Sequence, residues 1–335
     1  MRIAVDAVGG DHGPKTVIPG AVEGARRFGV DLVLVGPEDE IRRILATIDT
    51  SGVDIEVVNA PDTIGMDESP AQAVRRKPEA DINVALRLVK EGRADAMVSC
   101  GNSGAVMAAA LLHLGRIPGI DRPAIASPMP STRGRTLVLD LGAVTDPKPL
   151  NLVQFARMGV IFSQRAMGVA RPTVGLLSNG EEPGKGNQLV QETYELLKAE
   201  PDLNFHGNVE GRDVPRGIVD VVVTDGFTGN VLLKVAEGAA SFVGEIIREE
   251  ITSSLVRKLA AGFLRPAFRR ARERIDYAEI GGALLLGVNG VTVIAHGRSN
   301  ERAIANAIGV AARAADATVP QAIAQALGSA AAKVA

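Results

Sequence analysis

The sequence has little of several things that would define a protein class. Its 335 residues include one cysteine, two tyrosines and no tryptophan, so an internal disulfide is excluded and nothing points to an exported, disulfide-stabilised fold. The net charge of −2 gives no overall attraction to nucleic acid, and we expect no nucleic-acid partner. Asp6 interrupts the first apolar stretch, which argues against a signal peptide. The longest apolar stretch near the C-terminus, 283–295, is shorter than the about 20 residues that span a membrane. We therefore expect a cytoplasmic protein.

Motifs of the common nucleotide and metal enzymes are also missing. The only Gly-x-Gly, at 184–186, has Leu189 where a dinucleotide fingerprint needs its third glycine. As a P-loop, residues 180–185 are one residue too short, and Gly186 stands where the magnesium-binding Ser or Thr would be. The four histidines are scattered, without His-Glu-x-x-His or a cysteine pair, and Gly-x-Ser-x-Gly is absent. The sequence thus predicts no metal site and no nucleotide cofactor.

What the sequence does contain is an alternation of short apolar runs and helical patterns. Several runs are continuously hydrophobic, which is typical of strands buried on both faces of a parallel sheet. This alternation predicts an α/β protein, a three-layer α/β/α sandwich with a mostly parallel sheet, folded as a single domain over 1–335. A helical stretch over 230–276, interrupted at Gly262 and Pro266, is expected to form a helical hairpin within it. The predicted strands are Arg2–Ala7, Asp31–Val35, Asp54–Val58, Ala94–Ser99, Ala124–Ser127, Thr136–Leu141, Thr173–Leu177, Val219–Thr224 and Gly290–Ala295, and the predicted helices include Lys15–Phe28, Ala80–Glu91, Ser103–Leu114 and Leu150–Met167.

Four glycine-rich loops follow predicted strands directly, at 6–14, 99–104, 178–186 and 224–230. Glycine lets a backbone approach a ligand closely, and the helix that follows offers unpaired N–H groups to an anion. Placed on one edge of the sheet, these loops would surround a phosphate with neutral donors. The alternative is that such loops need glycine for turns and Asn or Ser for helix caps.

Single residues in these loops have competing interpretations. Lys185, between two glycines, is a candidate anion-binding cation, and Asn230 is a candidate hydrogen-bond donor. Asp225 and Asn230 could equally shape the turn and cap the next helix. Cys100 is a weak candidate for a nucleophile, because cysteine is more often a small buried residue and no histidine is adjacent to activate it.

Across these motifs the sequence resembles the phosphate acyltransferases of bacterial phospholipid synthesis, the PlsX family. The resemblance extends over nearly the whole chain. The motifs that carry it are Asp6-Ala-Val-Gly-Gly-Asp11, Ser99-Cys-Gly-Asn-Ser-Gly-Ala105, Asp140-Leu-Gly-Ala143, Gln154-Phe-Ala-Arg-Met-Gly159, Gly175-Leu-Leu-Ser-Asn-Gly-Glu-Glu182 with Lys185-Gly186, Gly207-Asn-Val-Glu-Gly-Arg-Asp213, Thr224-Asp-Gly-Phe-Thr-Gly-Asn230 and Gly281-Gly-Ala-Leu-Leu-Leu-Gly287.

The resemblance implies transfer of a fatty acyl group from acyl–acyl carrier protein to inorganic phosphate, giving the acyl phosphate used in phospholipid synthesis. It implies a fold like that of isocitrate dehydrogenases and phosphotransacetylases, working as a homodimer without a metal. Lys185 would bind phosphate, Asn230 and Asn102 would donate to the developing oxyanion, and Asp225 would orient Lys185 or handle a proton. The candidate catalytic residues are Lys185, Asn230 and Asp225, and the candidate substrate-binding residues are Gly10, Asp11, Gly101, Asn102, Ser103, Gly104, Asp140, Asn179, Gly186, Thr228 and Gly229.

Three other functions remain open on the sequence. A phosphotransacetylase acting on acyl-CoA needs the same phosphate and thioester sites. A non-enzymatic membrane scaffold would use only the hairpin. An isocitrate-type dehydrogenase would share the fold, but no cluster of metal-binding carboxylates supports it.

The hairpin carries the most uneven charge in the chain. Between Leu255 and Arg274 there are seven basic residues and one acidic residue, a local charge of +7 − 1 = +6. Apolar residues recur every four positions in the same stretch, which is typical of an amphipathic helix. We expect its tip, near Leu259–Phe268, to contact anionic membrane peripherally, although the stripe could pack in a dimer interface instead. The candidate membrane-contact residues are Leu255, Leu259, Phe263, Leu264 and Phe268.

Overall fold

A computed structural model describes residues 1–275 and 280–334; the side chains of Leu255, Leu259, 271–275 and 328–334 lie outside the described part. Within it, 11 strands form one continuous sheet in the order β3-β2-β1-β4-β11-β10-β5-β6-β9-β7-β8. The strands are β1 Arg2–Asp6, β2 Asp31–Gly36, β3 Ile55–Asn59, β4 Ala96–Ser99, β5 Ala124–Ser131, β6 Gly134–Leu139, β7 Thr173–Leu177, β8 Asn204–Val209, β9 Val221–Val223, β10 Ala283–Leu286 and β11 Val291–Ile294.

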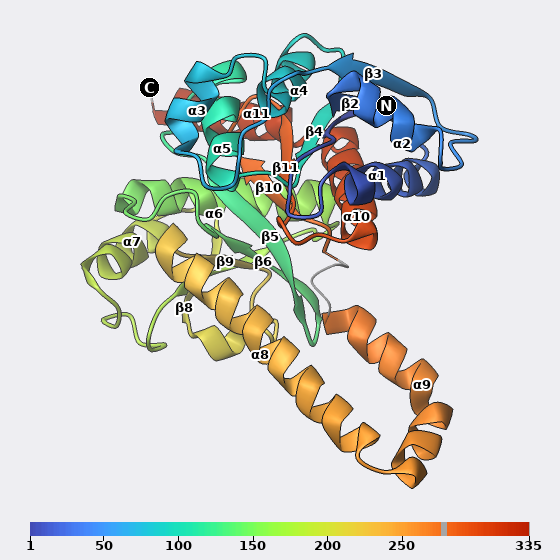
Figure 1. Ribbon diagram of the computed structural model, residues 1–335. Helices are drawn as coiled ribbons and strands as arrows, with labels where there is room; N and C mark the ends of the chain where they lie inside the picture. Colours follow the sequence, from blue (N-terminus) through green and yellow to red (C-terminus); the bar gives the residue numbers. More distant parts are fainter. Residues whose placement is uncertain (276–279, 335) are drawn as a thin grey trace.

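Helices cover both faces of this sheet, as Figure 1 shows. Alternate residues of β1 belong to different cores: Ile3 and Val5 face the core under α1, α6 and α10, whereas Ala4 faces the core under α3, α4 and α5. The expected three-layer α/β fold is therefore confirmed. The helices are α1 Pro14–Phe28, α2 Glu38–Leu45, α3 Pro70–Arg76, α4 Asp81–Lys90, α5 Ser103–His113, α6 Pro149–Ala166, α7 Gln188–Lys198, α8 Gly226–Thr252, α9 Leu255–Ile275, α10 Glu301–Asp316 and α11 Val319–Val334, with a 3₁₀ turn at Gly211–Asp213.

The strands of the two halves run in opposite directions. Strands β1, β2, β3, β4 and β11 are mutually parallel, and so are β6, β7, β8 and β9. Between them, β10 is antiparallel to both β11 and β5, and β5 is antiparallel to β6, which reverses the direction of the second group. The four glycine-rich loops therefore follow strands of two oppositely directed groups, which the sequence did not predict. The loops after β1 and β4 leave one edge, and those after β7 and β9 leave the opposite edge.

Helices α8 and α9 form the expected hairpin, which projects away from the sheet (Figure 1). Its turn lies at Ser253–Ser254, not at Gly262 or Pro266, which are both inside α9. The expected tip over Leu259–Phe268 therefore lies on the returning helix, and this part of the prediction is corrected. No helix in the described ranges is both long enough and apolar enough to cross a bilayer.

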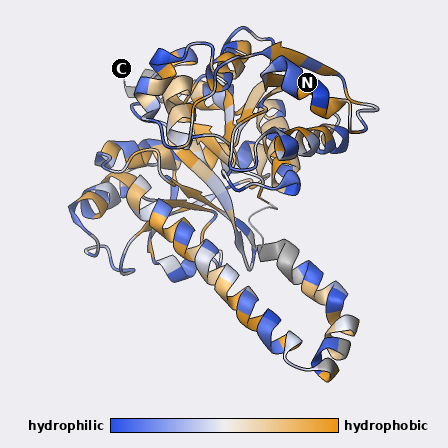
Figure 2. Ribbon diagram, viewed as in Figure 1, coloured by the Kyte–Doolittle hydropathy of each residue, from blue (hydrophilic) through white to orange (hydrophobic). Residues whose placement is uncertain are grey.

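The hairpin exposes apolar side chains on both helices. On α9, Phe263 is 89% exposed, and Leu264 and Phe268 are also exposed; Leu255 and Leu259 are predicted membrane contacts whose side chains lie outside the described part. Figure 2 shows hydrophobic and hydrophilic residues alternating along both helices, in contrast with the hydrophobic strands inside the molecule. The exposed apolar residues of α8 are Phe227, Val231, Val235, Phe242, Val243, Ile246 and Ile247.

Candidate active site

The turn from β9 into α8 places the predicted catalytic residues Asp225 and Asn230. The Asp225 carboxylate caps the helix, because its Oδ1 accepts the Thr228 N–H at 2.8 Å. Asn230 is exposed, and its amide lies beside the β6–α6 loop, where a Cβ on Gly142 would be 3.4 Å from Asn230 Nδ2. Asp225 thus fixes the start of the helix that carries Asn230. Thr228 is exposed between them.

The loop after β7 carries Lys185 at the same edge, because β7 and β9 are paired parallel neighbours. Asn179 Oδ1 accepts the Gly186 N–H at 2.9 Å, and the Lys185 N–H bonds the Glu182 carbonyl at 3.0 Å. Gly186 has φ +96°, which favours glycine. In the part of the chain that the structure describes, the exposed Lys185 ammonium has no hydrogen-bond or ion-pair partner, so it is available to an anion.

Asp140, predicted to bind substrate, is buried and holds the loops of this edge together. Its side chain is 0% exposed and accepts four backbone N–H groups, so in this structure its contacts are with the protein itself. A Cβ on Gly229 would overlap the Asp140 carbonyl, so this glycine allows α8 to pack closely on the strand end. The four N–H groups, at 2.7–3.1 Å, come from Ile125, Gly142, Ala143 and Val144.

At the opposite edge, Asp6 has the corresponding role. Its carboxylate accepts the N–H groups of Val8 and Gly9 at 3.2 and 2.9 Å, and the Ser99 hydroxyl at 2.6 Å. A Cβ on Gly9 would overlap Asp6 Oδ2, so the glycine again packs against the protein itself. The Ser99 hydroxyl also accepts the Gly101 N–H at 3.0 Å. These contacts join the loops after β1 and β4.

Gly10 and Asp11 continue this cluster toward the loop after β11. Gly10 has φ +88°, and a Cβ there would meet Cys100 Cβ and the Gly297 carbonyl at 3.0 Å. The Asp11 N–H donates to that carbonyl at 2.8 Å, and the Asp11 side chain is exposed.

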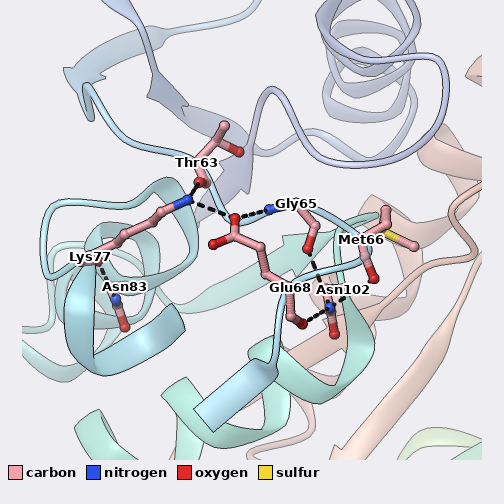
Figure 3. A network of polar contacts seen from close by, with 7 residues as sticks. All are labelled: Thr63, Gly65, Met66, Glu68, Lys77, Asn83 and Asn102. Carbon is pink, nitrogen blue, oxygen red and sulfur yellow. Dashed lines mark hydrogen bonds and ion pairs between the residues drawn. The ribbon is translucent and has the colours of Figure 1, made fainter. Parts of the chain in front are cut away.

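Asn102, predicted to bind substrate, is a structural clamp (Figure 3). Its amide nitrogen donates to three carbonyls of the β3–α3 loop at 3.1–3.3 Å, and its Oδ1 caps α5 by accepting the Ala105 N–H at 3.1 Å. The clamped loop is fixed further by Lys77, which bonds Glu68 at 2.6 Å. Ser103 is exposed on the first turn of α5, whereas a Cβ on Gly104 would meet Pro70 at 2.7 Å. In this structure the Asn102 amide N–H groups are therefore used within the protein, and its role toward an oxyanion stays a prediction.

A second buried carboxyl lies beside Asp6. Burial, and then the charge of Asp6, raise the pKa of Asp81 to about 8. The nearby Thr63 hydroxyl opposes this rise, but it makes no hydrogen bond to Asp81 Oδ2. The same two causes raise the pKa of the Cys100 thiol to about 12. Cys100 is 2% exposed, so neither its ionisation nor its position suits a nucleophile.

Sequence reasoning missed a contact between the two halves. Lys234 Nζ lies 2.9 Å from His296 Nε2 and 3.0 Å from Glu237 Oε2, and His296 Nε2 is 3.9 Å from the same carboxylate oxygen. A signal was available: Lys234 is one helical turn after Asn230, and His296 directly follows a predicted strand. The sequence alone gives His296 no metal-ligand pattern, because no other histidine or cysteine lies near it.

One group of carboxylates in the described residues has the spacing of a metal site: Glu181, Glu210 and Asp213. Arginines already pair with all three. Arg212 contacts Glu181 at 3.3 Å and also Glu210, and Arg216 lies 3.6 Å from Asp213. We assign this group to loop structure.

The fold is that of the phosphotransacetylases. A phosphotransacetylase from Streptococcus pyogenes aligns with a TM-score of 0.65 at 18% identity, covering 94% of each chain. A branched-chain phosphotransacylase from Enterococcus faecalis aligns with a TM-score of 0.57 at 13% identity, covering 94% of this chain and 99% of the other. At such identities the likeness concerns the fold alone.

Sequence comparison narrows this class to one family. The chain belongs to the fatty acid synthesis protein family, whose model matches residues 1–322. A phosphate acyltransferase from Geobacter sulfurreducens is 52% identical over 92% of this chain and 89% of its own. One from Trichlorobacter lovleyi is 48% identical over 98% of this chain and 94% of its own. The resemblance noted in the motifs is thereby confirmed.

Proposed function

We propose that this chain transfers a fatty acyl group from acyl–acyl carrier protein to inorganic phosphate, giving an acyl phosphate for phospholipid synthesis. The observation that carries the proposal is the identity of 48–52% with phosphate acyltransferases over at least 92% of the chain. In this reaction a phosphate oxygen forms a bond to the acyl carbon, the carbon–sulfur bond breaks, and the phosphate proton ends on the departing thiolate.

The edge formed by β7 and β9 supports this chemistry. Phosphate is already an anionic nucleophile near neutral pH, so the site mainly has to hold it and stabilise the oxyanion that develops on the carbonyl. The Lys185 ammonium, which has no partner among the residues that the structure describes, is suited to the first task, and the exposed amide of Asn230 to the second. Asp225 positions Asn230 through the helix cap.

The identity of the acyl donor is tested directly. Purified protein is incubated with labelled phosphate and either acyl–acyl carrier protein or acyl-CoA, and acyl phosphate is trapped as the hydroxamate. We expect product from the carrier-protein thioester. Product from acyl-CoA alone would favour a phosphotransacetylase activity, and no product from either would leave the scaffold function.

We place the membrane contact on α9. Phe263, Leu264 and Phe268 are exposed beside Arg265 and Arg270, the pattern of a helix that lies in an anionic lipid surface. Phe263→Glu with Leu264→Glu should abolish flotation with anionic vesicles and leave soluble acyl transfer intact. Added salt should weaken binding of the wild type, because exposed charges are screened.

A second copy of the chain would cover α8. Its exposed apolar residues recur along one side of the helix for most of its length, which is more than an isolated protein normally leaves in water. Phe242→Glu should therefore shift the mass measured by light scattering from dimer to monomer. The α9 double variant serves as the matched control and should remain dimeric.

A further inference from the structure

The contact of Lys234, Glu237 and His296 connects the two oppositely directed halves of the sheet. Lys234 and Glu237 lie on the early turns of α8, which starts at the β9 edge and packs Leu232 and Ala236 over the sheet. His296 directly follows β11, next to the loops held by Asp6. A ligand bound at this contact would touch both halves at once.

The Lys234 ammonium is held by two acceptors and keeps one hydrogen for a ligand. It donates to Glu237 at 3.0 Å and to His296 Nε2 at 2.9 Å, and in the described residues no acceptor takes its third N–H. The side chain is 51% exposed, whereas Glu237 is only 16% exposed. This arrangement aims an ammonium group without enclosing it.

Hydrogen bonding defines the state of His296. The Arg298 N–H approaches Nδ1 at 3.3 Å, and Lys234 Nζ approaches Nε2 at 2.9 Å. Because a neutral imidazole has a single acceptor nitrogen, we assign Nε2 as the acceptor, on the shorter contact, and Nδ1 as the protonated nitrogen. Burial, then the charge of Lys234, lower the pKa of His296, which keeps the ring neutral. Other charged groups that face the ring are Glu237, Arg298 and Asp11.

Asn230 lies four residues before Lys234 on α8, so its amide is on the same side of the helix as the ammonium. An ammonium group binds a phosphate oxygen as a point charge through a charge-assisted hydrogen bond, and Lys234 lies one turn from the oxyanion donor Asn230. We propose that Lys234, positioned by Glu237 and His296, is a second attachment point for a phosphate group in the acyl-transfer site. The group belongs either to free phosphate or to the phosphodiester of the donor's prosthetic arm.

This inference rests on the proposed function, but its first test does not. Binding of inorganic phosphate to the enzyme is measured by calorimetry for wild type, Lys234→Met and the control Lys198→Met, an exposed lysine on α7. We expect a tenfold or greater rise in the Kd of Lys234→Met and no change in the control. Loss of wild-type acyl transfer would overturn the proposed function and leave this binding result valid.

Kinetics then distinguish the two sources of phosphate. A raised KM for phosphate in Lys234→Met assigns the site to the free anion, and a raised KM for the acyl donor alone, with unchanged phosphate binding, assigns it to the phosphodiester. Changes below twofold in the phosphate Kd and in both KM values overturn the proposal, whatever happens to kcat.

The positioning residues have their own readout. His296→Gln keeps an acceptor for Lys234 and should retain most binding, whereas His296→Ala should not. Both variants and the wild type are compared at one pH, because phosphate itself gains a proton on acidification. If both His296 variants lose phosphate binding equally, the histidine acts only through packing, and its positioning role is contradicted.

Discussion

Asp140 and Asp6 stand at the ends of strands in opposite halves of the sheet, and each gathers glycine-rich loops around a buried carboxylate. Asp140 accepts four backbone N–H groups, and burial raises its pKa while those bonds oppose the shift. Asp6 accepts only two backbone N–H groups and a hydroxyl, and the buried Asp81 carboxyl lies beside it. Two carboxylates in one apolar site cannot both ionise cheaply, so this pair shares a proton.

The location of that proton follows from the contacts. Three hydrogen bonds favour the charged form of Asp6, whereas Asp81 Oδ2 has no partner in the described residues. The proton therefore resides on Asp81. The comparison separates a carboxylate held by four backbone N–H groups, beside the loop that Asn230 contacts, from a pair of carboxyls at the other edge whose protonation depends on pH.

The largest expected effect is the loss of stability when the Asp140 carboxylate is removed. Asp140→Ala leaves four buried N–H groups without an acceptor and should lower the free energy of unfolding by about 3–5 kcal/mol. Asp6→Ala should cost less, about 1–3 kcal/mol, because Asp6 accepts only two backbone N–H groups and one hydroxyl. Urea denaturation of both variants measures the difference, and an equal or reversed order would contradict this ranking of the two centres.

The next effect concerns catalysis at the Asp140 edge. Lys185→Ala and Asn230→Ala should fold normally, because both side chains are exposed. Loss of one oxyanion donor is worth about 10²–10³-fold in rate, so kcat of Asn230→Ala should fall by that amount. Lys185→Ala should also raise the KM for phosphate. Near wild-type rates at limiting phosphate in both variants would move the site away from this edge.

Most of the fold could be predicted from the sequence, because strands such as β2 and β9 are continuous runs of buried aliphatic residues. Strand β8, with Asn, His and Gly among its six residues, was missed because its pairing with β7 stabilises it rather than its composition. Strand β10 was missed because it lies within one long apolar stretch with β11. The sequence does not predict that the two groups of parallel strands run in opposite directions, because this depends on β5 and β10 pairing antiparallel between them.

The candidate site was predicted in part. Lys185 and Asn230 follow adjacent parallel strands, as the motifs suggested. Asn102 and Asp140 were assigned to substrate because a polar residue in a glycine-rich loop has the same sequence pattern whether it binds a ligand or the loop itself. Lys234 and His296 are 62 residues apart, and only the tertiary structure brings them into contact.

A pH titration sharpens the comparison at the Asp6 edge. An unfolded aspartate has a pKa of about 3.9, whereas that of Asp81 in the folded chain is about 8. Between these values the folded chain binds a proton that the unfolded chain has lost, so stability falls as pH rises from about 4 to about 8 and then levels off. Asp81→Asn should flatten this dependence and stabilise the protein at pH 8 by an amount on the order of a few kcal/mol. An unchanged slope would place the proton elsewhere.

The smallest expected effect is that of Cys100→Ala in the same cluster. The thiol is buried and its pKa is raised to about 12, so almost no thiolate exists at neutral pH. Phosphate attacks the thioester directly in the proposed reaction, and no acyl-enzyme is required. Removing the sulfur should cost about 1 kcal/mol of stability and change kcat by less than twofold.

A matched variant one residue away tests whether the cluster or the thiol matters. Ser99→Ala removes the 2.6 Å bond to Asp6 and the acceptor of the Gly101 N–H, so it should destabilise the protein more than Cys100→Ala. Both variants are compared by thermal unfolding and by acyl phosphate formation. An acyl thioester trapped on Cys100, or lost activity in Cys100→Ala with Ser99→Ala still active, would replace direct attack by a covalent route.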